Sequence, residues 1–424
     1  MTNTATDITL SLCIAAGARP DFLDRLLGRV AADGGLPEPY EIVVSDAAAD
    51  GAIKEIVERR AAEGLPVVRF RHAGAAHRPG DATSLLAALR RGRGRYRVAL
   101  AEDELPVPGA LREAVAFLDA HPEVLACYAP WELHDEAPGA VATAQYAIAA
   151  DAVFGRGDAM ELFGFLVQNG AAPEAAVYRA EALRALSTPS RHCHAGFVGL
   201  ARLIAEGALA FRTQPFRRIA TRDPFTGRRH DSAAVNAADW DLHRGGLEFY
   251  VRALLARTGT APDPAHRPAF RDAIDAYVET RMRLAFRVAM GRGDFLAAHE
   301  IHNRLSLLSL GEPRPPVESL ERLPLLVAVQ TLARLANDTA EVERVVLVGV
   351  EDGPSISSLL RELGLERRIL VAPPLEAPGE KAIRGSLVFL GEKAADERAR
   401  FIEQGYAPSL VVDERDLIAG ICLP

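Results

Sequence analysis

Residues 96–111 read YRVALAEDELPVPGAL, an apolar run that passes directly into three consecutive carboxylates. The apolar residues Val98–Leu100 predict a short buried strand, and the Pro-x-Pro-Gly turn that follows predicts the start of a helix. Ligands of open α/β sheets bind beyond the carboxyl ends of the strands, where carboxylates can hold a divalent cation against substrate phosphates. The stretch therefore predicts a binding site at Glu102–Glu104. The alternative is a solvated turn in which Glu104 favours the next helix through its dipole.

The composition is that of a globular protein. The 424 residues suffice for two or three domains, with 49% hydrophobic and 25% charged residues. A net charge of −8 and a pI near 5.8 argue against non-specific nucleic-acid binding. The sequence contains no run of 18 apolar residues, so no transmembrane helix is predicted. The polar first residues lack the pattern of a signal peptide. We expect a cytoplasmic protein.

The four cysteines, Cys13, Cys127, Cys193 and Cys422, show no Cys-x-x-Cys spacing. This disfavours a structural zinc site or a disulfide framework, and small buried hydrophobic residues are expected instead. Cys193 lies between His192 and His194, so a catalytic cysteine there is the minor alternative.

Strand and helix patterns alternate from the start of the chain to residue 111. Apolar runs predict strands, and residues spaced by three and four predict helices between them. Short loops between alternating elements favour a parallel, doubly wound sheet. The predicted strands are residues 8–14, 40–44, 67–70 and 98–100, and the predicted helices are residues 21–30, 52–63 and 81–91.

Several landmarks occur in order along the first part of the chain: residues 19–23, 41–44, Asp46, Asp50-Gly51, 92–96, 108–111 and 121–123. With these landmarks, the first 120 or so residues resemble the nucleotide-sugar-binding half of the family 2 glycosyltransferases, which have the GT-A fold. The resemblance implies that Asp46 contacts the nucleoside base of a sugar donor. It also implies that Glu102 and Asp103 bind Mg²⁺ or Mn²⁺, which bridges the donor diphosphate, with Glu104 nearby.

Three segments depart from the family pattern. Residues 15–18 replace a Pro-Thr-Tyr-like segment, Ser45-Asp46 replaces paired aspartates, and Leu85-Leu86 replaces an Arg-Asn pair. The apolar periodicity is intact, so these departures do not argue against the predicted fold. They leave the identity of the donor sugar open.

The family's acceptor-side base falls near Ala195-Gly196, where this chain has no carboxylate. Histidine can accept a proton near neutral pH, so His192 or His194 is a candidate substitute. Asp158 or Glu161, from a different segment, is another. The alternative for either histidine is a surface loop residue with a satisfied hydrogen bond.

Two further segments have open interpretations. Arg229 and His230 resemble the segment that closes over the donor diphosphate, where cations stabilise the departing nucleoside diphosphate. The alternative is a mobile basic loop. Trp131 is either a sugar-stacking platform or a core aromatic residue, and packing is the favoured interpretation.

We expect a GT-A domain over residues 1–232 and a helical connector or homo-oligomerisation region over 233–338. A small Rossmann-like α/β domain is expected over 339–424. Its turn has Gly349 and Gly353 but lacks the full dinucleotide fingerprint, so it predicts no cofactor.

The resemblance implies an inverting, metal-assisted, hexosyltransferase-like enzyme. It would move a sugar from a nucleoside diphosphate to a hydroxyl of a glycan or related acceptor, as in polysaccharide biosynthesis. The alternative is a non-catalytic sugar-nucleotide-binding or scaffolding protein derived from such an enzyme. A nucleotidyltransferase is disfavoured, because the chain lacks a Gly-rich, basic loop after its first strand.

Overall fold

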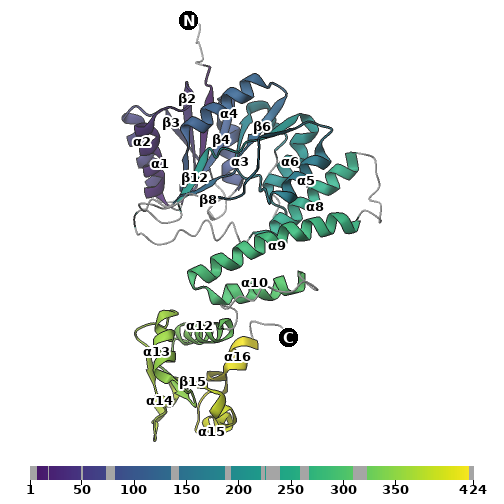
Figure 1. Cartoon of the computed structure of the whole chain (residues 1–424). Coiled ribbons are helices and arrows are strands. Elements are labelled where there is room, and N and C mark those ends of the chain that lie inside the picture. Colours follow the sequence, from purple (N-terminus) through teal and green to yellow (C-terminus); the bar gives the residue numbers. More distant parts are fainter. Residues whose placement is uncertain are drawn as a thin grey trace. The chain divides into compact units, whose positions relative to one another are not determined.

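The protein forms two compact units, residues 1–281 and 282–424, in a computed structural model (Figure 1). The structure describes residues 7–17, 19–48, 51–72, 82–134, 143–186, 192–220, 225, 239–257, 267–308 and 322–419. Arg229 and His230 lie outside the described residues. Among those described, no helix is long and apolar enough to cross a membrane.

An eight-stranded mixed sheet forms the centre of the first unit. Its order is β3-β2-β1-β4-β10-β6-β11-β9, and the pairs among β1 to β4 are parallel. The strands are β1 Leu10–Ala16, β2 Tyr40–Asp46, β3 Val67–Arg71, β4 Tyr96–Ala101, β6 Val124–Tyr128, β9 Ala152–Phe154, β10 Ala176–Arg179 and β11 Ala208–Phe211.

The predicted α/β class is confirmed, but the sheet is not parallel throughout. Strand β10 lies antiparallel to both β4 and β6, and β9 lies antiparallel to β11. The parallel direction of the strands was predicted from the regular alternation of strands and helices. This alternation ends after the helix that follows β4. Beyond that point, an apolar run indicates a strand without indicating its direction.

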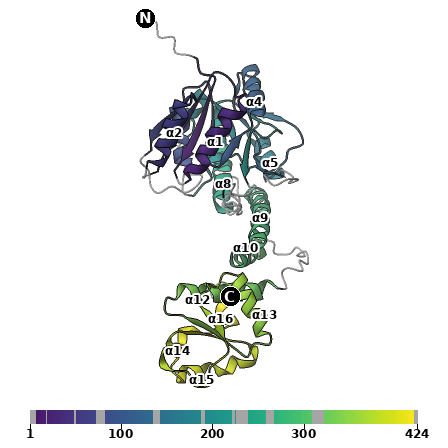
Figure 2. The ribbon, with the colours of Figure 1, turned by 90° about the vertical axis from the view of Figure 1, so that its left-hand side faces the viewer.

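Helices cover both faces of this sheet. Helices α1 (Pro20–Asp33), α2 (Ala52–Ala62) and α4 (Pro108–Ala120) pack on one face (Figure 2). Helix α3 (Ala82–Arg91) packs on the other face. Helix α1 has the helical spacing of apolar residues that predicted it. It begins at a proline, which suits the first turn of a helix, and its apolar residues are buried. These are Phe22, Leu23, Leu26, Leu27 and Val30.

A second, smaller sheet lies beyond the end of β4. Its order is β5-β12-β7-β8, formed by β5 (Glu104–Pro106), β12 (Arg217–Ala220), β7 (Glu132–His134) and β8 (Thr143–Ala144). In the antiparallel pair of β5 and β12, Glu104 lies opposite Ile219. The acidic stretch therefore leaves the large sheet and enters the small one, which brings Arg217 to Glu104.

Helix α8 (Trp240–Arg257) approaches α6 (Ala195–Glu206) closely because two glycines face it. A Cβ on Gly245 would lie 2.0 Å from the His192 carbonyl oxygen, and one on Gly246 would lie 2.9 Å from the Phe197 ring. Only residues without a Cβ allow this approach. As a result, His243 of α8 lies beside His194, with ring centroids 4.4 Å apart. Two further helices, α5 (Ala159–Gln168) and α9 (Arg267–Arg292), also contribute residues to this unit.

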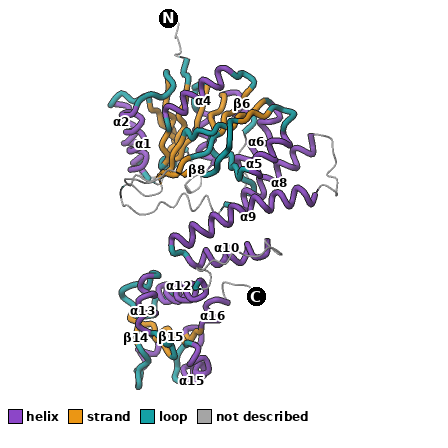
Figure 3. The backbone as a smooth tube through the Cα atoms, viewed as in Figure 1, coloured by secondary structure: helices purple, strands orange, loops and turns teal. Residues whose placement is uncertain are grey.

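The second unit contains a four-stranded parallel sheet of order β14-β13-β15-β16. Strands β14 and β15 are labelled in Figure 3. The strands are β13 (Arg344–Val348), β14 (Leu370–Ala372), β15 (Ser386–Leu390) and β16 (Val411–Asp413). The helices are α10 (Phe295–Leu308), α12 (Leu323–Asp338), α13 (Gly353–Glu362), α14 (Glu380–Arg384), α15 (Arg398–Glu403) and α16 (Glu414–Ala419).

Two of the four cysteines are buried as the sequence predicted, whereas Cys193 is half-buried and Cys422 lies outside the described residues. Cys13 and Cys127 are free thiols in the core, and burial raises the pKa of the Cys127 thiol to about 12. Such a group stays protonated and packs as a small hydrophobe.

A buried polar network closes the amino-terminal edge of the large sheet. The Ser11 hydroxyl donates to the Glu41 carboxylate at 2.7 Å, and the Gly94 amide donates to the Ser11 hydroxyl at 2.7 Å. Arg93 also binds Glu41 through its guanidinium at 3.0 Å. Because Ser11 and Arg93 satisfy the Glu41 carboxylate at this edge, Glu41 has a structural role.

We predict that Gly94→Ala destabilises the first unit. Its Cβ would lie 2.6 Å from the Ser11 amide nitrogen, so the backbone must shift, at a cost of about 2 kcal/mol. Gly164→Ala in α5 is the matched control, because its Cβ meets nothing within 4 Å. The control should gain about 0.5–1 kcal/mol, since alanine favours a helix over glycine. Thermal unfolding followed by circular dichroism measures both; equal melting temperatures would contradict the prediction.

Candidate functional site

Acidic residues gather at the carboxyl edge of the parallel strands. Asp46 is the last residue of β2, and Glu102 and Asp103 directly follow β4. Strand β1 pairs with both β2 and β4, so the three acids follow neighbouring strands at one edge. All three are buried, and Asp103 is 5% exposed. The sequence placed these acids at a sheet rim, and the structure brings them to one.

Arg19 neutralises the pair at the end of β4. Its Nε lies 3.3 Å from Glu102 Oε1, and its Nη2 lies 3.0 Å from Asp103 Oδ2. The other Glu102 oxygen accepts a hydrogen bond from the Gly17 amide at 2.8 Å. Arg19 directly precedes α1, so this pairing also fixes the start of that helix against β4.

Asp46 is engaged within the protein as well. Its Oδ2 pairs with the Arg69 guanidinium of β3, and its Oδ1 accepts a hydrogen bond from the Ala48 amide at 2.9 Å. Both oxygens therefore have protein partners, and any contact with a nucleoside base would be shared with them.

The oxygen donors of Glu102 and Asp103 are of the kind that Mg²⁺ and Mn²⁺ take. The arrangement does not fit an ion as it stands, because Arg19 already lies against both carboxylates and Gly17 engages the second Glu102 oxygen. A cation at this place would have to displace the guanidinium.

Glu104 has a different partner, Arg217 of β12. Glu104 Oε2 lies 3.0 Å from Arg217 Nη1 and accepts the Ala101 amide at 2.9 Å. Burial raises the pKa of Glu104, an effect that Arg217 opposes and Asp103 reinforces. Both partners of this ion pair are buried, so each depends on the other for its charge to be compensated.

A cavity of about 310 Å³ lies next to this ion pair. Its apolar walls come from α3, β4, β10 and α6, and include Leu86, Ala99 and Tyr178. Its polar wall contains Glu104, Glu174, His194 and Arg217. A mostly apolar hollow with a few converging polar groups is typical of a binding site for a small molecule.

Glu174 lies at the centre of the polar wall. Its Oε2 accepts a hydrogen bond from the Trp131 indole at 2.8 Å and lies 3.8 Å from Arg217 Nη2. Its Oε1 lies 3.8 Å from His194 Nε2 and 3.8 Å from His243 Nε2. Sequence reasoning missed Glu174, which precedes β10 in a loop without a motif. It also missed His243, which lies on α8, 69 residues after Glu174 in the chain.

Burial lowers the pKa of both imidazoles. For His194 the charge of Glu174 opposes this effect, and for His243 the neighbouring His194 reinforces it. Both rings are therefore neutral near pH 7, and a neutral imidazole has one nitrogen able to accept a proton or bind a cation.

The three base candidates lie in different surroundings. His194 caps the start of α6 and lines the cavity, as does its neighbour Cys193. His192 is exposed and is not part of the cavity lining. The Asp158 carboxylate accepts a hydrogen bond from the Gly155 amide at 2.7 Å, in the turn before α5, and does not line the cavity. Trp131 is 4% exposed, which agrees with the packing interpretation.

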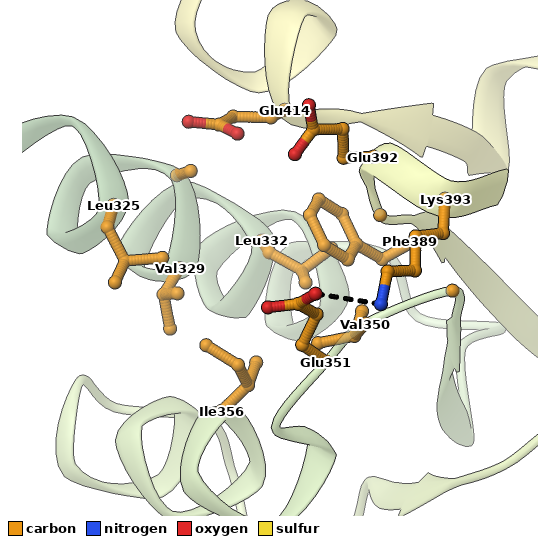
Figure 4. A pocket seen from close by; sticks show the side chains of 13 residues that line it. Leu325, Val329, Leu332, Val350, Glu351, Ile356, Phe389, Glu392, Lys393 and Glu414 are labelled. Atoms are coloured by element: carbon orange, nitrogen blue, oxygen red, sulfur yellow. Dashed lines mark ion pairs between the residues drawn. The ribbon is translucent and has the colours of Figure 1, made fainter. Parts of the chain in front are cut away.

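The second unit has a smaller cavity, of about 180 Å³, at the carboxyl ends of β13 and β15 (Figure 4). Apolar side chains of α12, with Phe389, form one side, and Glu351, Glu392 and Glu414 lie around it. Glu351 pairs with Lys393 at 2.7 Å. This cavity lies where the strand order reverses direction, a position at which α/β sheets often bind ligands.

No family model and no curated protein matches this chain. Among solved structures, S. aureus TarS 1-349 in complex with UDP-GlcNAc covers 78% of this chain and 88% of its own, with 14% identity and a TM-score of 0.46. The mannosyltransferase PcManGT from Pyrobaculum calidifontis, in complex with GDP-Man and Mn²⁺, covers 76% of this chain and 85% of its own. Its identity is 19% and its TM-score 0.40. Likeness at this level assigns neither an activity nor a ligand to this chain.

We predict that Arg217→Met destabilises the first unit by about 3 kcal/mol at neutral pH, because it leaves Glu104 charged and buried without its partner. The raised pKa of Glu104 sets the pH dependence. A protonated Glu104 needs no cation, so the deficit should be largest at high pH and shrink as pH falls through the pKa of the folded state.

Urea unfolding of wild type and variant at several pH values measures this difference. Arg218→Met is the matched control, because the neighbouring arginine is 43% exposed and pairs with Glu132 at the surface. A second substitution, Glu104→Gln, should recover part of the Arg217→Met loss. A deficit independent of pH, or equal for the two arginines, would contradict the role given to the ion pair.

Proposed function

We propose that the chain is a glycosyltransferase that moves a hexose from a nucleoside diphosphate to a hydroxyl of a glycan or related acceptor. The observation that carries the proposal is the gathering of Asp46, Glu102 and Asp103 at one strand edge, with a cavity beside the next acid of the stretch. The GT-A assignment of residues 1–232, the connector or oligomerisation role of 233–338 and the Rossmann-like assignment of 339–424 belong to the same proposal.

Arg19 supports placing the donor diphosphate at this edge. A guanidinium suits phosphate oxygens, and Arg19 directly precedes α1, whose dipole favours an anion at its start. Asp46 would contact the nucleoside base. Mg²⁺ or Mn²⁺ at Glu102 and Asp103 comes from the family resemblance and would neutralise charge on the diphosphate. Arg19 holds these carboxylates in the structure and would have to leave them before an ion could bind.

His194 supports placing the acceptor in the cavity. The acceptor oxygen would attack the anomeric carbon while the bond to the diphosphate oxygen breaks. The hydroxyl proton passes to His194, and the nucleoside diphosphate leaves with the bonding electrons. Glu174 lies 3.8 Å from the ring nitrogen and would stabilise the imidazolium. A single displacement of this kind inverts the sugar carbon. Arg229 and His230 would stabilise the leaving diphosphate.

One observation favours the rival function, a non-catalytic sugar-nucleotide-binding or scaffolding protein. Both oxygens of Asp46 and both oxygens of Glu102 bond to groups of the protein itself. Carboxylates that only brace a fold would look the same. The two functions differ in turnover, because the rival binds nucleotide without cleaving the sugar bond.

We predict that one of the UDP-, GDP- or dTDP-sugars raises the melting temperature of the protein, since a ligand that binds only the folded state stabilises it. The protein should hydrolyse or transfer that sugar, tested with and without manganese. Asp103→Asn keeps the side-chain shape and should lower turnover by about 100-fold, because the Asp103 carboxylate positions the Arg19 guanidinium that would bind the diphosphate.

Glu113→Gln, on the exposed face of α4, is the control and should leave turnover unchanged. Tight binding of a nucleotide with no turnover of any donor would instead establish the rival function. Unchanged turnover in Asp103→Asn would remove the acidic edge from the mechanism.

A further inference from the structure

We propose that Glu174, His194 and His243 form a binding site for a divalent transition metal, with Zn²⁺ as the best-fitting ion. The proposal does not depend on glycosyl transfer. One ligand atom from each residue lies within 4.8 Å of the other two. The three residues come from the loop before β10, the start of α6 and the first turns of α8.

The distances suit an ion after a small contraction. Glu174 Oε1 lies 3.8 Å from each imidazole Nε2. A tetrahedral zinc with bonds of about 2.1 Å holds its ligand atoms about 3.4 Å apart. The ligand atoms of the two imidazoles lie within 4.8 Å of each other, so side-chain shifts of up to about 1 Å would close the site.

Neighbouring groups leave one lone pair of His243 and one of Glu174 facing the proposed ion. The Tyr277 hydroxyl donates to the Ala171 carbonyl oxygen at 3.5 Å, so its oxygen is available to accept from His243 Nδ1 at 3.1 Å. This assigns the hydrogen of His243 to Nδ1 and leaves a lone pair on Nε2. The Trp131 indole donates a hydrogen bond to Glu174 Oε2, which leaves Glu174 Oε1 to bind the ion. Such supporting hydrogen bonds are typical of metal ligands.

His243 Nε2 is also unsatisfied. The residue is 1% exposed, and within the described parts of the chain Nε2 has no hydrogen-bond partner. A buried acceptor without a partner costs free energy, so the native protein is expected to supply one. At 3.8 Å the Glu174 oxygen is too far away to serve, and a cation between the three atoms would satisfy both.

The donor set indicates the kind of ion. Two imidazoles and one carboxylate suit zinc and its first-row neighbours, whereas Mg²⁺ and Ca²⁺ prefer oxygen ligands alone. Three protein ligands leave one position open, and Glu174 and His194 both line the 310 Å³ cavity. The positive charges of Arg217 and Arg281 face this region, with Glu104 and Glu174 opposing them. We therefore expect weaker binding than at an all-cysteine zinc site.

An ion here would change the role of His194 in the proposed transfer. Bound metal takes the Nε2 lone pair that would otherwise accept a proton. A hydroxyl at the open position would then lose its proton more readily because of the ion's charge. Either the metal or the neutral His194 ring would activate the acceptor hydroxyl. The two cannot act at once, because both need the Nε2 lone pair.

The test uses the full chain, stripped with a chelator and dialysed against Zn²⁺ or Co²⁺. We expect one bound ion per chain by elemental analysis, a rise in melting temperature, and the visible absorption of Co²⁺ with nitrogen ligands. Glu174→Gln and His243→Gln should each lower the affinity by at least about tenfold. His121→Gln is the control, because His121 also lies beside a glutamate but is 45% exposed.

Tyr277→Phe provides a second variant should the ligand substitutions fail to fold. It keeps the ring and all three ligands but removes the hydroxyl behind His243, and should lower the affinity by about tenfold. Wild-type protein that binds much less than one ion, or binding that survives the ligand substitutions, would overturn the proposal. None of these measurements involves sugar transfer, so their failure is distinct from failure of the proposed enzyme activity.

Discussion

Three consecutive carboxylates are buried at the end of β4, and each needs a cation within the protein. Arg19 pairs with Glu102 and Asp103, and Arg217 pairs with Glu104. An unpaired buried charge costs several kcal/mol, so these arginines are required by the acids rather than added to them. The first pairing fixes the start of α1 against the large sheet. The second holds the strands of the small sheet beyond it.

The same ion pairs connect two different surroundings. On one side is the rim of the parallel strands, where Arg19 and the start of α1 present positive charge. On the other is the cavity, whose polar wall begins at Glu104 and continues through Arg217 to Glu174 and the two histidines. Glu104 connects them, because the charge of Asp103 at the rim raises the pKa of Glu104 and Arg217 of the cavity wall pairs with it. A change of charge at one side therefore acts on the other through this buried carboxylate.

The sequence predicted the parts of the fold that depend on local pattern. Val98–Leu100 lies within β4, and the apolar spacing of residues 21–30 matches the buried face of α1. The acids at the strand edge follow from the same local reading. The polar wall could not be predicted, because its residues meet only through tertiary contacts. Gly245 and Gly246 let α8 approach α6, which places His243 at Glu174. Trp131, predicted to be a core residue or a sugar-stacking platform, also donates a hydrogen bond to Glu174.

The central claim is that the rim of β1, β2 and β4 receives a nucleoside diphosphate. A crystal structure of the protein soaked with the nucleotide sugar that stabilises it most would test this directly. The diphosphate should lie within hydrogen-bonding distance of Arg19, with the base beside Asp46. Clear density for the nucleotide elsewhere, for example at the carboxyl ends of β13 and β15, with Arg19 still bound to Glu102 and Asp103, would contradict the claim.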